Sequence, residues 1–281
     1  MKNIKDKVAL VTGASSGIGK ATVKRLLGQG CIVYAAARRT ERMNDLQEMG
    51  AYVVSLDVTD EGSANACVEQ IVKEHRRLDI LINNAGYGSY GAVEDVPLEE
   101  ARRQFDVNLF GLARITQLAL PHMRSRGYGK IVNISSIAGK VYTPLGAWYV
   151  ATKHALEGWS DALRFETQSF GIDVIVIEPG GINTEWGGIA RDSLLEQSGV
   201  GAYRPLAQNM AHLLQDTYEN AKGSSPEVVA RLIVKAVSAK KPRPRYHGGY
   251  LSGLALRARW WLSDRQFDRF MRWQMKSMSK S

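Results

Sequence analysis

The chain has 281 residues, 44% of them hydrophobic, so it can bury a substantial core and is not a disordered polar chain. Its formal net charge of +9 is confined to the C-terminal end, because residues 240–281 hold 11 lysines and arginines against two aspartates. The rest of the chain is formally neutral, which excludes it as a surface for a nucleic-acid backbone.

The cysteine and hydropathy patterns indicate a reducing compartment. Cys31 and Cys67 are the only cysteines, and neither stands in a metal-ligand spacing, so we expect no disulfide and no metal site. The N-terminus has no signal-peptide core, and no stretch approaches ~20 apolar residues in a row. We therefore expect a cytoplasmic protein without a membrane-spanning helix.

Apolar segments of strand length alternate along the chain with segments of helical period. The strand-like segments are residues 7–13, 31–37, 51–57, 78–86, 129–136 and 172–180. The helical patterns lie at about 18–28, 62–76, 98–124 and 147–169. This alternation predicts an α/β fold with a doubly wound, mostly parallel, Rossmann-like sheet flanked by helices.

Residues 1–240 are predicted to form one dinucleotide-binding catalytic domain. From about 185 to 225 the alternation stops, and apolar residues such as Trp186 and Leu194 are spread over short helix-like pieces. Because ligands of such sheets bind beyond the C-terminal ends of the strands, we interpret this insertion as a lid. The alternative is that these pieces are ordinary helices that pack on the core. Residues 241–281 are predicted to form a basic extension.

A glycine-rich turn follows the first predicted strand in the segment TGASSGIGKA, with Gly13, Gly17 and Gly19. Glycines let the main chain approach a pyrophosphate closely, and the helix N-terminus that follows favours negative charge. The spacing G-x-x-x-G-x-G departs from the commoner G-x-G-x-x-G, and no Gly-Lys-Ser/Thr completes a P-loop. We interpret the turn as a dinucleotide site; a turn without a ligand is the alternative.

The second predicted strand ends at Arg38 and Arg39, where an NAD site would place an acidic residue for the adenosine ribose. A guanidinium can donate to a 2′-phosphate, which a carboxylate would repel. The sequence therefore favours NADP(H) over NAD as cofactor. If these are only surface arginines, the choice stays open.

Two Tyr-x-x-x-Lys segments, Tyr149–Lys153 and Tyr218–Lys222, would each place a phenol and an ammonium on one face of a helix. Thirteen residues before Tyr149 stands Ser136, at the end of a predicted strand, whereas Pro205 holds that place before Tyr218. Only the first pair is therefore predicted to be catalytic, and Tyr218 is interpreted as lid packing.

Seven motifs in chain order resemble the short-chain dehydrogenase/reductase family: TGASSGIG, LDVTD, NNAG, FDVN, NISS, YVATK and IEPGGINT. The resemblance covers roughly residues 5–240 and looks most like the branch of 17-beta-hydroxysteroid and retinol dehydrogenases. It implies a catalytic tetrad of Asn108, Ser136, Tyr149 and Lys153, with Asn108 holding a water for proton supply.

The resemblance also implies a set of cofactor contacts. Residues 83–86 would brace the site, Asp57 and Val58 would contact adenine, and Ile182 and Thr184 would hold the carboxamide and phosphates. The predicted cofactor-binding residues are Gly13, Ser15, Ser16, Gly17, Ile18, Gly19, Arg38, Arg39, Asp57, Val58, Asn84, Ala85, Gly86, Tyr149, Lys153, Pro179, Gly180, Ile182 and Thr184.

The function predicted from these residues is NADP(H)-dependent oxidoreduction between an alcohol and a ketone or aldehyde on a lipophilic small molecule. Tyr149 would be the acid/base, its phenol made more acidic by Lys153 and by the oxidised nicotinamide. The alternative is a nucleotide-sensing or scaffold protein of the same fold that docks through its basic tail. The resemblance further implies a homo-dimer or homo-tetramer, and no nucleic-acid partner is expected.

The C-terminal extension is predicted to contain a basic amphipathic helix from about Ser263. Its apolar face would carry Phe267, Phe270, Met271, Met275 and Met278, and its basic face Arg265, Arg269, Arg272 and Lys276. Such a helix can pack on the catalytic domain or on a second subunit, or it can lie on an anionic membrane through residues 250–280.

Overall fold

The computed structural model describes residues 4–218 and 222–278, with side chains as far as residue 273 in the last helix. Its centre is a seven-stranded parallel sheet in the order β3-β2-β1-β4-β5-β6-β7. The strands are β1 (Val8–Thr12), β2 (Ile32–Ala37), β3 (Tyr52–Ser55), β4 (Ile80–Asn83), β5 (Gly129–Ile134), β6 (Ile172–Pro179) and β7 (Arg245–Gly248). The predicted fold class and its six strands are confirmed, and β7 is an addition.

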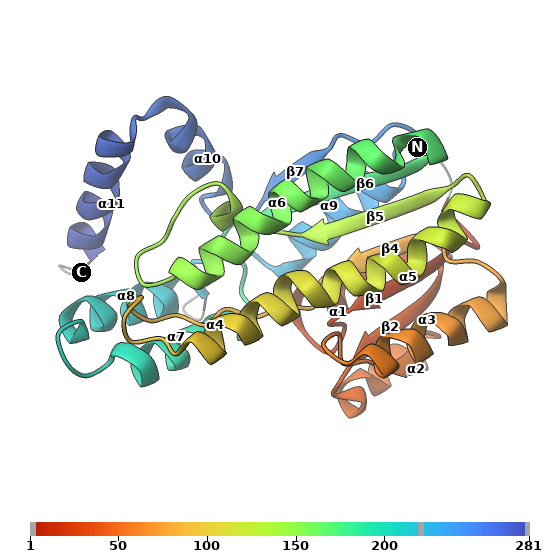
Figure 1. Cartoon of the computed structure of the whole chain (residues 1–281), viewed down its shortest axis with the longest axis horizontal. Helices are drawn as coiled ribbons and strands as arrows, with labels where there is room; N and C mark the ends of the chain where they lie inside the picture. Colours follow the sequence, from red (N-terminus) through yellow and green to blue (C-terminus); the bar gives the residue numbers. More distant parts are fainter. Residues whose placement is uncertain (1–3, 219–221, 279–281) are drawn as a thin grey trace.

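Helices cover both faces of the sheet (Figure 1). The strand β1 shows why, because its side chains alternate: Ala9 and Val11 pack toward one helical layer, and Val8 and Leu10 pack toward the other. The first layer contains α1 (Gly17–Leu27), η1 (Thr40–Met43), α2 (Asn44–Glu48) and α9 (Pro226–Val237). The second contains α3 (Glu61–His75), α5 (Leu112–Ser125) and α6 (Ala147–Thr167), and η4 (Gln168–Phe170) continues α6.

The helix predicted over residues 98–124 is divided in the structure. It consists of α4 (Leu98–Phe105), the π-helical segment η2 (Asp106–Gly111) and α5. A π-helical turn inserts an extra residue into the helical repeat, and such insertions are frequent at functional sites. Here the inserted segment carries Asn108, whose side chain is buried.

The predicted lid consists of α7 (Glu185–Ser198) and α8 (Arg204–Tyr218), which pack against each other. Leu194, Met210 and Leu214 form a small apolar core of their own, and this core reaches Tyr90 and Tyr149 of the main domain. The insertion is therefore both a packed helical unit and a cover over the C-terminal ends of the strands.

The C-terminal extension begins inside the sheet. The predicted domain boundary at residue 240 leaves β7 outside the catalytic domain, although β7 pairs with β6. Beyond it, α10 (Ser252–Trp261) and α11 (Asp264–Met278) form an arm that stands beside the lid (Figure 1). Within the described residues, no helix is both long and apolar enough to span a bilayer.

The apolar face predicted for α11 packs in part on the catalytic domain. Phe267 is buried, and its ring lies 5.4 Å from that of Tyr142. The hydroxyl of Tyr142 also donates a hydrogen bond to Asp268. The side chains of Met275, Lys276 and Met278 lie outside the described residues, so their predicted faces stay predictions.

Candidate active site

A cleft of about 380 Å³ opens at the C-terminal ends of the strands. It is lined by all but one of the predicted cofactor-binding residues, and it also contains Ser136. These lining residues are Gly13, Ser15, Ser16, Gly17, Ile18, Arg38, Arg39, Asp57, Val58, Asn84, Ala85, Gly86, Tyr149, Lys153, Pro179, Gly180, Ile182 and Thr184. Gly19 and Asn108 do not line the cleft, but they contact Gly13 and Tyr87, which do.

The glycine turn after β1 is fixed by close contacts with the turn after β4. Gly13 has a φ of +65°, and a Cβ there would lie 2.8 Å from the Ala85 Cα. A Cβ on Gly19 would lie only 2.3 Å from the Gly13 carbonyl oxygen. The Asn84 side chain donates to the carbonyls of Thr12 and Gly13, over 3.0 and 3.1 Å. The turn is thus held open as a cradle of main-chain atoms.

The residues of the predicted brace at 83–86 have two different roles. Asn84 and Ala85 both donate from their backbone N–H to the Thr12 hydroxyl, each over 3.0 Å. Asn83 does not line the cleft; its buried amide donates to Asn133 and Thr116 within the protein. Asn83 therefore fixes β4 against its neighbours, and the residues after it form the wall of the cleft.

Charged side chains meet across the end of the cleft that Arg38 and Arg39 line. Arg38 Nη1 lies 3.9 Å from an Asp57 carboxylate oxygen. Arg39 Nη2 lies 3.5 Å from Glu185, the first residue of α7, and Arg42 pairs with the same carboxylate over 2.9 Å. The Arg42 hydrogen bonds hold the pKa of Glu185 below its usual range. These ion pairs join the arginines after β2 to the lid.

Ser136, Tyr149 and Lys153 meet at the inner end of the cleft, as the sequence predicted. Ser136 ends the chain segment that leaves β5, and its hydroxyl accepts the Ala138 N–H at the start of η3 (Ile137–Gly139). It also lies close enough to the Tyr149 phenol to lower the pKa of that phenol. Lys153 donates to the Ile134 carbonyl over 2.9 Å, and its Nζ lies 5.8 Å from the Tyr149 ring centroid.

Burial shifts the pKa values of the phenol and the ammonium in opposite directions. Desolvation, followed by the nearby Tyr90, raises the pKa of Tyr149 well above its usual value, and the Ser136 hydrogen bond opposes this in part. Burial lowers the pKa of Lys153 to about 8, with Glu157 acting against it. The protein's own groups thus favour a neutral phenol, so Lys153 by itself does not produce the predicted acidic one.

Asn108 contacts the loop after β4. Its side chain accepts the Tyr87 N–H over 3.0 Å, and it donates to the Tyr87 carbonyl over 2.9 Å and to the Thr152 hydroxyl over 3.2 Å. These bonds tie the loop to the π-helical segment and to α6. The water-holding role implied by the resemblance stays a prediction.

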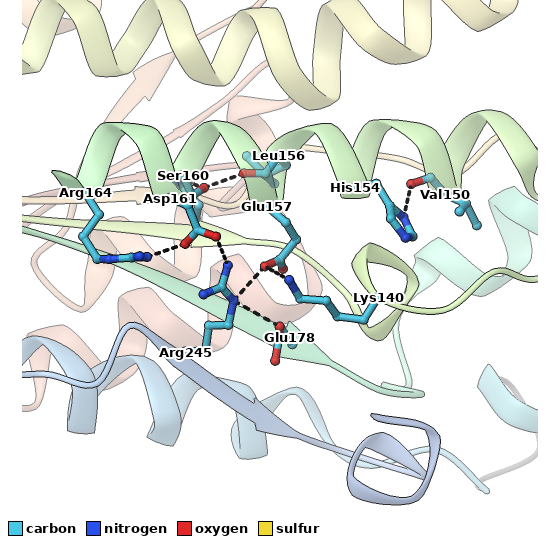
Figure 2. Close-up of polar contacts among 11 residues, drawn as sticks. Lys140, Val150, His154, Leu156, Glu157, Ser160, Asp161, Arg164, Glu178 and Arg245 are labelled. Carbon is cyan, nitrogen blue, oxygen red and sulfur yellow. Dashed lines mark hydrogen bonds and ion pairs between the residues drawn. The ribbon is translucent and has the colours of Figure 1, made fainter. Parts of the chain in front are cut away.

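A charged cluster lies on α6 beyond Lys153 (Figure 2). Arg245 of β7 donates to Glu157 over 2.9 Å and to Asp161 over 2.7 Å, and it lies 3.6 Å from Glu178 of β6. Lys140 Nζ lies 3.0 Å from Glu157. Burial, and then the charge of Glu157, raises the pKa of Glu178 to about 7. The cluster therefore joins β7 to the helix that carries the predicted catalytic pair.

Several residues that line the cleft were not among the predicted site residues, although Trp186, Ile189 and Tyr218 belong to the predicted lid. The Trp186 ring lies 5.1 Å from the rings of both Tyr149 and Tyr218, so Tyr218 lines the cleft besides packing in the lid. The signal for Trp186 is its place just after a strand end, in an insertion rich in apolar residues. The other lining residues outside the predicted set are Ala37, Leu56, Tyr87, Arg103, Val107, Ile134, Ser135, Glu185 and Ile189.

Comparison with known proteins identifies relatives over nearly the whole chain. The chain is 36% identical to a 3-ketodihydrosphingosine reductase of Bacteroides thetaiotaomicron over 269 residues, which is 95% of this chain and 97% of that protein. It is 34% identical to an NADPH-dependent 3-dehydrocapnine reductase of Ornithobacterium rhinotracheale over 286 residues, covering 98% of this chain and 99% of that protein.

A solved structure has the same fold. A short-chain dehydrogenase from Streptomyces avermitilis superposes with a TM-score of 0.80 at 32% identity, covering 99% of this chain and 100% of the other. The profile of the short chain dehydrogenase family matches residues 7–193. The narrower likeness to steroid and retinol dehydrogenases stays a prediction. From the profile match and these relatives, the chain belongs to the short-chain dehydrogenase/reductase family of oxidoreductases.

Proposed function

We propose that the protein is an NADP(H)-preferring reductase that interconverts a ketone and a secondary alcohol on a long-chain lipid. The observation that carries this proposal is the meeting of Ser136, Tyr149 and Lys153 at the inner end of a cleft whose other end is a glycine cradle. One end suits a dinucleotide, and the other suits proton transfer to a carbonyl oxygen.

The residues present fit a dinucleotide. The main-chain cradle at Gly13 and Gly17, closed against Ala85 and Thr184, leaves no room for side chains and suits a pyrophosphate. Arg38 would hold the 2′-phosphate, and Lys153 would hydrogen-bond the nicotinamide ribose. When bound, the nicotinamide supplies or accepts the hydride.

The protein's groups would manage the oxygen and its proton. Ser136 and Tyr149 would hydrogen-bond the carbonyl oxygen, on which negative charge develops during reduction. Tyr149 would give that oxygen its proton, and the nearby cationic groups would stabilise the resulting phenolate. Lys153, with a pKa near 8, could then return a proton to the phenolate at neutral pH. The proton path through Asn108 stays part of this proposal.

The preference for NADP(H) rests on Arg38. Its side chain is 69% exposed and lies 3.9 Å from its nearest carboxylate, Asp57, so the guanidinium has donors left for a phosphate. Arg39 is engaged by Glu185. The relative from Ornithobacterium rhinotracheale is described as NADPH-dependent, which supports the same assignment.

The long-chain substrate is inferred from the lid and from the relatives. Trp186, Ile189 and Tyr218 give the cleft an apolar wall beside Tyr149. Two relatives that match nearly the whole chain are described as reductases of 3-ketodihydrosphingosine and 3-dehydrocapnine. The homo-dimer or homo-tetramer expected from the resemblance stays a prediction.

The test follows the absorbance of NADPH and of NADH in parallel while 3-ketodihydrosphingosine, a steroid ketone, a retinoid aldehyde or a short-chain ketone is added. We expect the fastest oxidation with NADPH and the long-chain ketone. Arg38→Ala should raise the KM for NADPH by about 10- to 100-fold and leave that for NADH nearly unchanged. Arg102→Ala, an exposed arginine paired with Glu99, is the matched control. A preference for NADH would overturn the cofactor assignment.

A further inference from the structure

The arm formed by α10 and α11 exposes three tryptophans. Trp260, Trp261 and Trp273 are 83%, 79% and 65% exposed. Tryptophan is usually well buried, and a cluster of exposed large aromatic residues marks a surface that meets something apolar. Phe267 of the same arm is buried against Tyr142, so the arm packs on the protein through one side and leaves the tryptophans on another.

Arginines accompany these tryptophans at helical spacing. Arg257 precedes Trp260 by three residues and Trp261 by four, and Arg269 precedes Trp273 by four. Residues three or four apart lie on the same face of a helix, so each aromatic side chain has a cation beside it. Arg257, Trp260 and Trp261 also border one shallow groove with an apolar lining.

The positive charge of this arm has few partners inside the protein. Asp264 pairs with Arg259 over 2.9 Å, and Asp268 accepts a hydrogen bond from Tyr142. Both acidic residues of the arm are therefore engaged. Among the residues that the structure describes, Arg257, Arg265, Arg269 and Arg272 form no ion pair, and all four are exposed.

The arm adjoins the substrate end of the cleft. Tyr142, which contacts both Phe267 and Asp268, lies in the segment between Ser136 and Tyr149. Helix α11 also contacts α8 of the lid. The arm that carries the tryptophans and arginines thus stands beside the lid (Figure 1).

We propose that two helix faces dock the protein on an anionic lipid bilayer: that of α10 with Arg257, Trp260 and Trp261, and that of α11 with Arg265, Arg269, Arg272 and Trp273. Tryptophan favours the boundary between headgroups and acyl chains, and exposed arginines are attracted to anionic headgroups. This combination of apolar rings and unpaired cations fits that boundary, whereas a second copy of the same basic surface would repel it. The docking does not depend on the proposed substrate.

The experiment uses the full chain without cofactor or substrate. The protein is sedimented with phosphatidylcholine vesicles and with vesicles that contain about 30% phosphatidylglycerol, in about 0.1 M and about 1 M salt. We expect binding to the anionic vesicles at low salt, with loss of most of it at high salt. Equal sedimentation with both lipids, or none with either, would refute the proposal.

Matched variants separate the surface from general properties of the chain. Trp260→Ser with Trp261→Ser, and Arg265→Glu with Arg269→Glu, should each lower the vesicle partition coefficient more than tenfold. Phe165→Ser removes an aromatic ring on α6 that is also 83% exposed, and Lys240→Glu with Lys241→Glu changes the net charge equally; both should bind as the wild type does.

Two further measurements test whether the variants are folded and whether a second subunit, rather than a membrane, covers the surface. All variants should keep the far-UV circular dichroism spectrum and the Tm of the wild type, which shows that they are folded. Light scattering then reports the oligomeric state. If the tryptophan variants change a dimer or tetramer into a monomer, the surface is a subunit contact and membrane docking is wrong.

Discussion

The two Tyr-x-x-x-Lys segments have the same spacing and different surroundings. Lys153 is 6% exposed and donates to the end of β5, and Tyr149 meets Ser136 there. Lys222 is exposed and pairs with Asp216 over 2.6 Å, whereas Tyr218 ends α8 and lines the cleft. The Trp186 ring contacts the rings of both tyrosines, with centroid distances of 5.1 Å.

This difference shows which features turn a spacing into a site. Tyr149 and Lys153 lie on one continuous helix, α6, and Lys153 donates to the last residue of β5, so both side chains line the cleft. Tyr218 reaches the same cleft without its lysine. The predicted catalytic pair therefore combines the spacing with a strand end that lies opposite it.

The largest effect is expected when Tyr149 and Tyr218 are replaced one at a time by phenylalanine. Tyr149→Phe should lower kcat by about 10²- to 10⁴-fold, because it removes the proposed proton donor. Tyr218→Phe should change kcat by less than about threefold, since it removes only a hydroxyl from the wall. Steady-state kinetics measure both, and cofactor binding by fluorescence should be unchanged in each. Similar losses in the two variants would contradict the comparison.

The second test concerns the two lysines and protein stability. The pKa of Lys153 is lowered to about 8, so the unfolded state binds more protons between that value and the ordinary lysine pKa, and stability rises with pH across this range. Lys153→Met removes the cost of the buried charge but also one hydrogen bond. At about pH 7 we expect a gain of about 2 kcal/mol in the free energy of unfolding.

Urea denaturation at about pH 7 and about pH 10 measures this effect. The gain should shrink at the higher pH, because the wild-type lysine is then largely neutral in the folded protein. Lys222→Met is the control and should leave the free energy of unfolding unchanged at both values, since that lysine is exposed. A Lys153→Met variant that is less stable at neutral pH would show that the lysine is not strained by burial.

A smaller effect is expected in the charged cluster of Figure 2, which contrasts with Lys153 because its charges are paired. The pKa of Glu178 is raised to about 7, so stability falls as the pH rises from the ordinary glutamate pKa through that value. Glu178→Gln removes this dependence. Between about pH 5 and about pH 8 its unfolding free energy should fall by about 1–2 kcal/mol less than that of the wild type. Parallel pH profiles would disprove the shift.

The smallest expected effect is on the stability of α6, the helix that carries Tyr149 and Lys153. Gly158 lies within α6, and a Cβ there would have no atom within 4 Å. Gly158→Ala should stabilise the protein by about 0.5–1 kcal/mol, because alanine loses less conformational freedom in a helix. Thermal unfolding measures the rise in Tm, and kcat should stay constant. A lower Tm would mean that α6 is constrained by contacts outside this chain.

The buried part of the fold could be predicted from the sequence, because a run of apolar residues of strand length indicates a buried strand. The strand β7 could not, since only Tyr246 of its four residues is buried and the segment has no apolar run. Helix α9 lies outside the four predicted helical segments, although Ser225 caps it and Pro226 opens it. The π-helical insertion at Asn108 also gave no signal, because one extra residue hardly alters the helical repeat.

Within the site, the conformation of the glycine turn could be predicted, because main-chain geometry dictates glycine there. Prediction failed where distant segments converge. Trp186 reaches Tyr149 only through the packing of the lid, and Glu185 reaches Arg42 across 143 positions of the chain. The pKa of Tyr149 depends on burial by several elements, which a spacing of four residues does not reveal.

The carboxylate of Glu185, shared by Arg39 and Arg42, has a consequence for the cofactor cycle. If a phosphate binds to Arg39 and Arg42, it displaces the Glu185 carboxylate, and the carboxylate returns when the phosphate leaves. The arginines then face a negative charge at every stage. Binding of the phosphate and its release are each an exchange of one anion for another. We expect this exchange to lower the affinity for the product cofactor and to shorten its residence time on the protein.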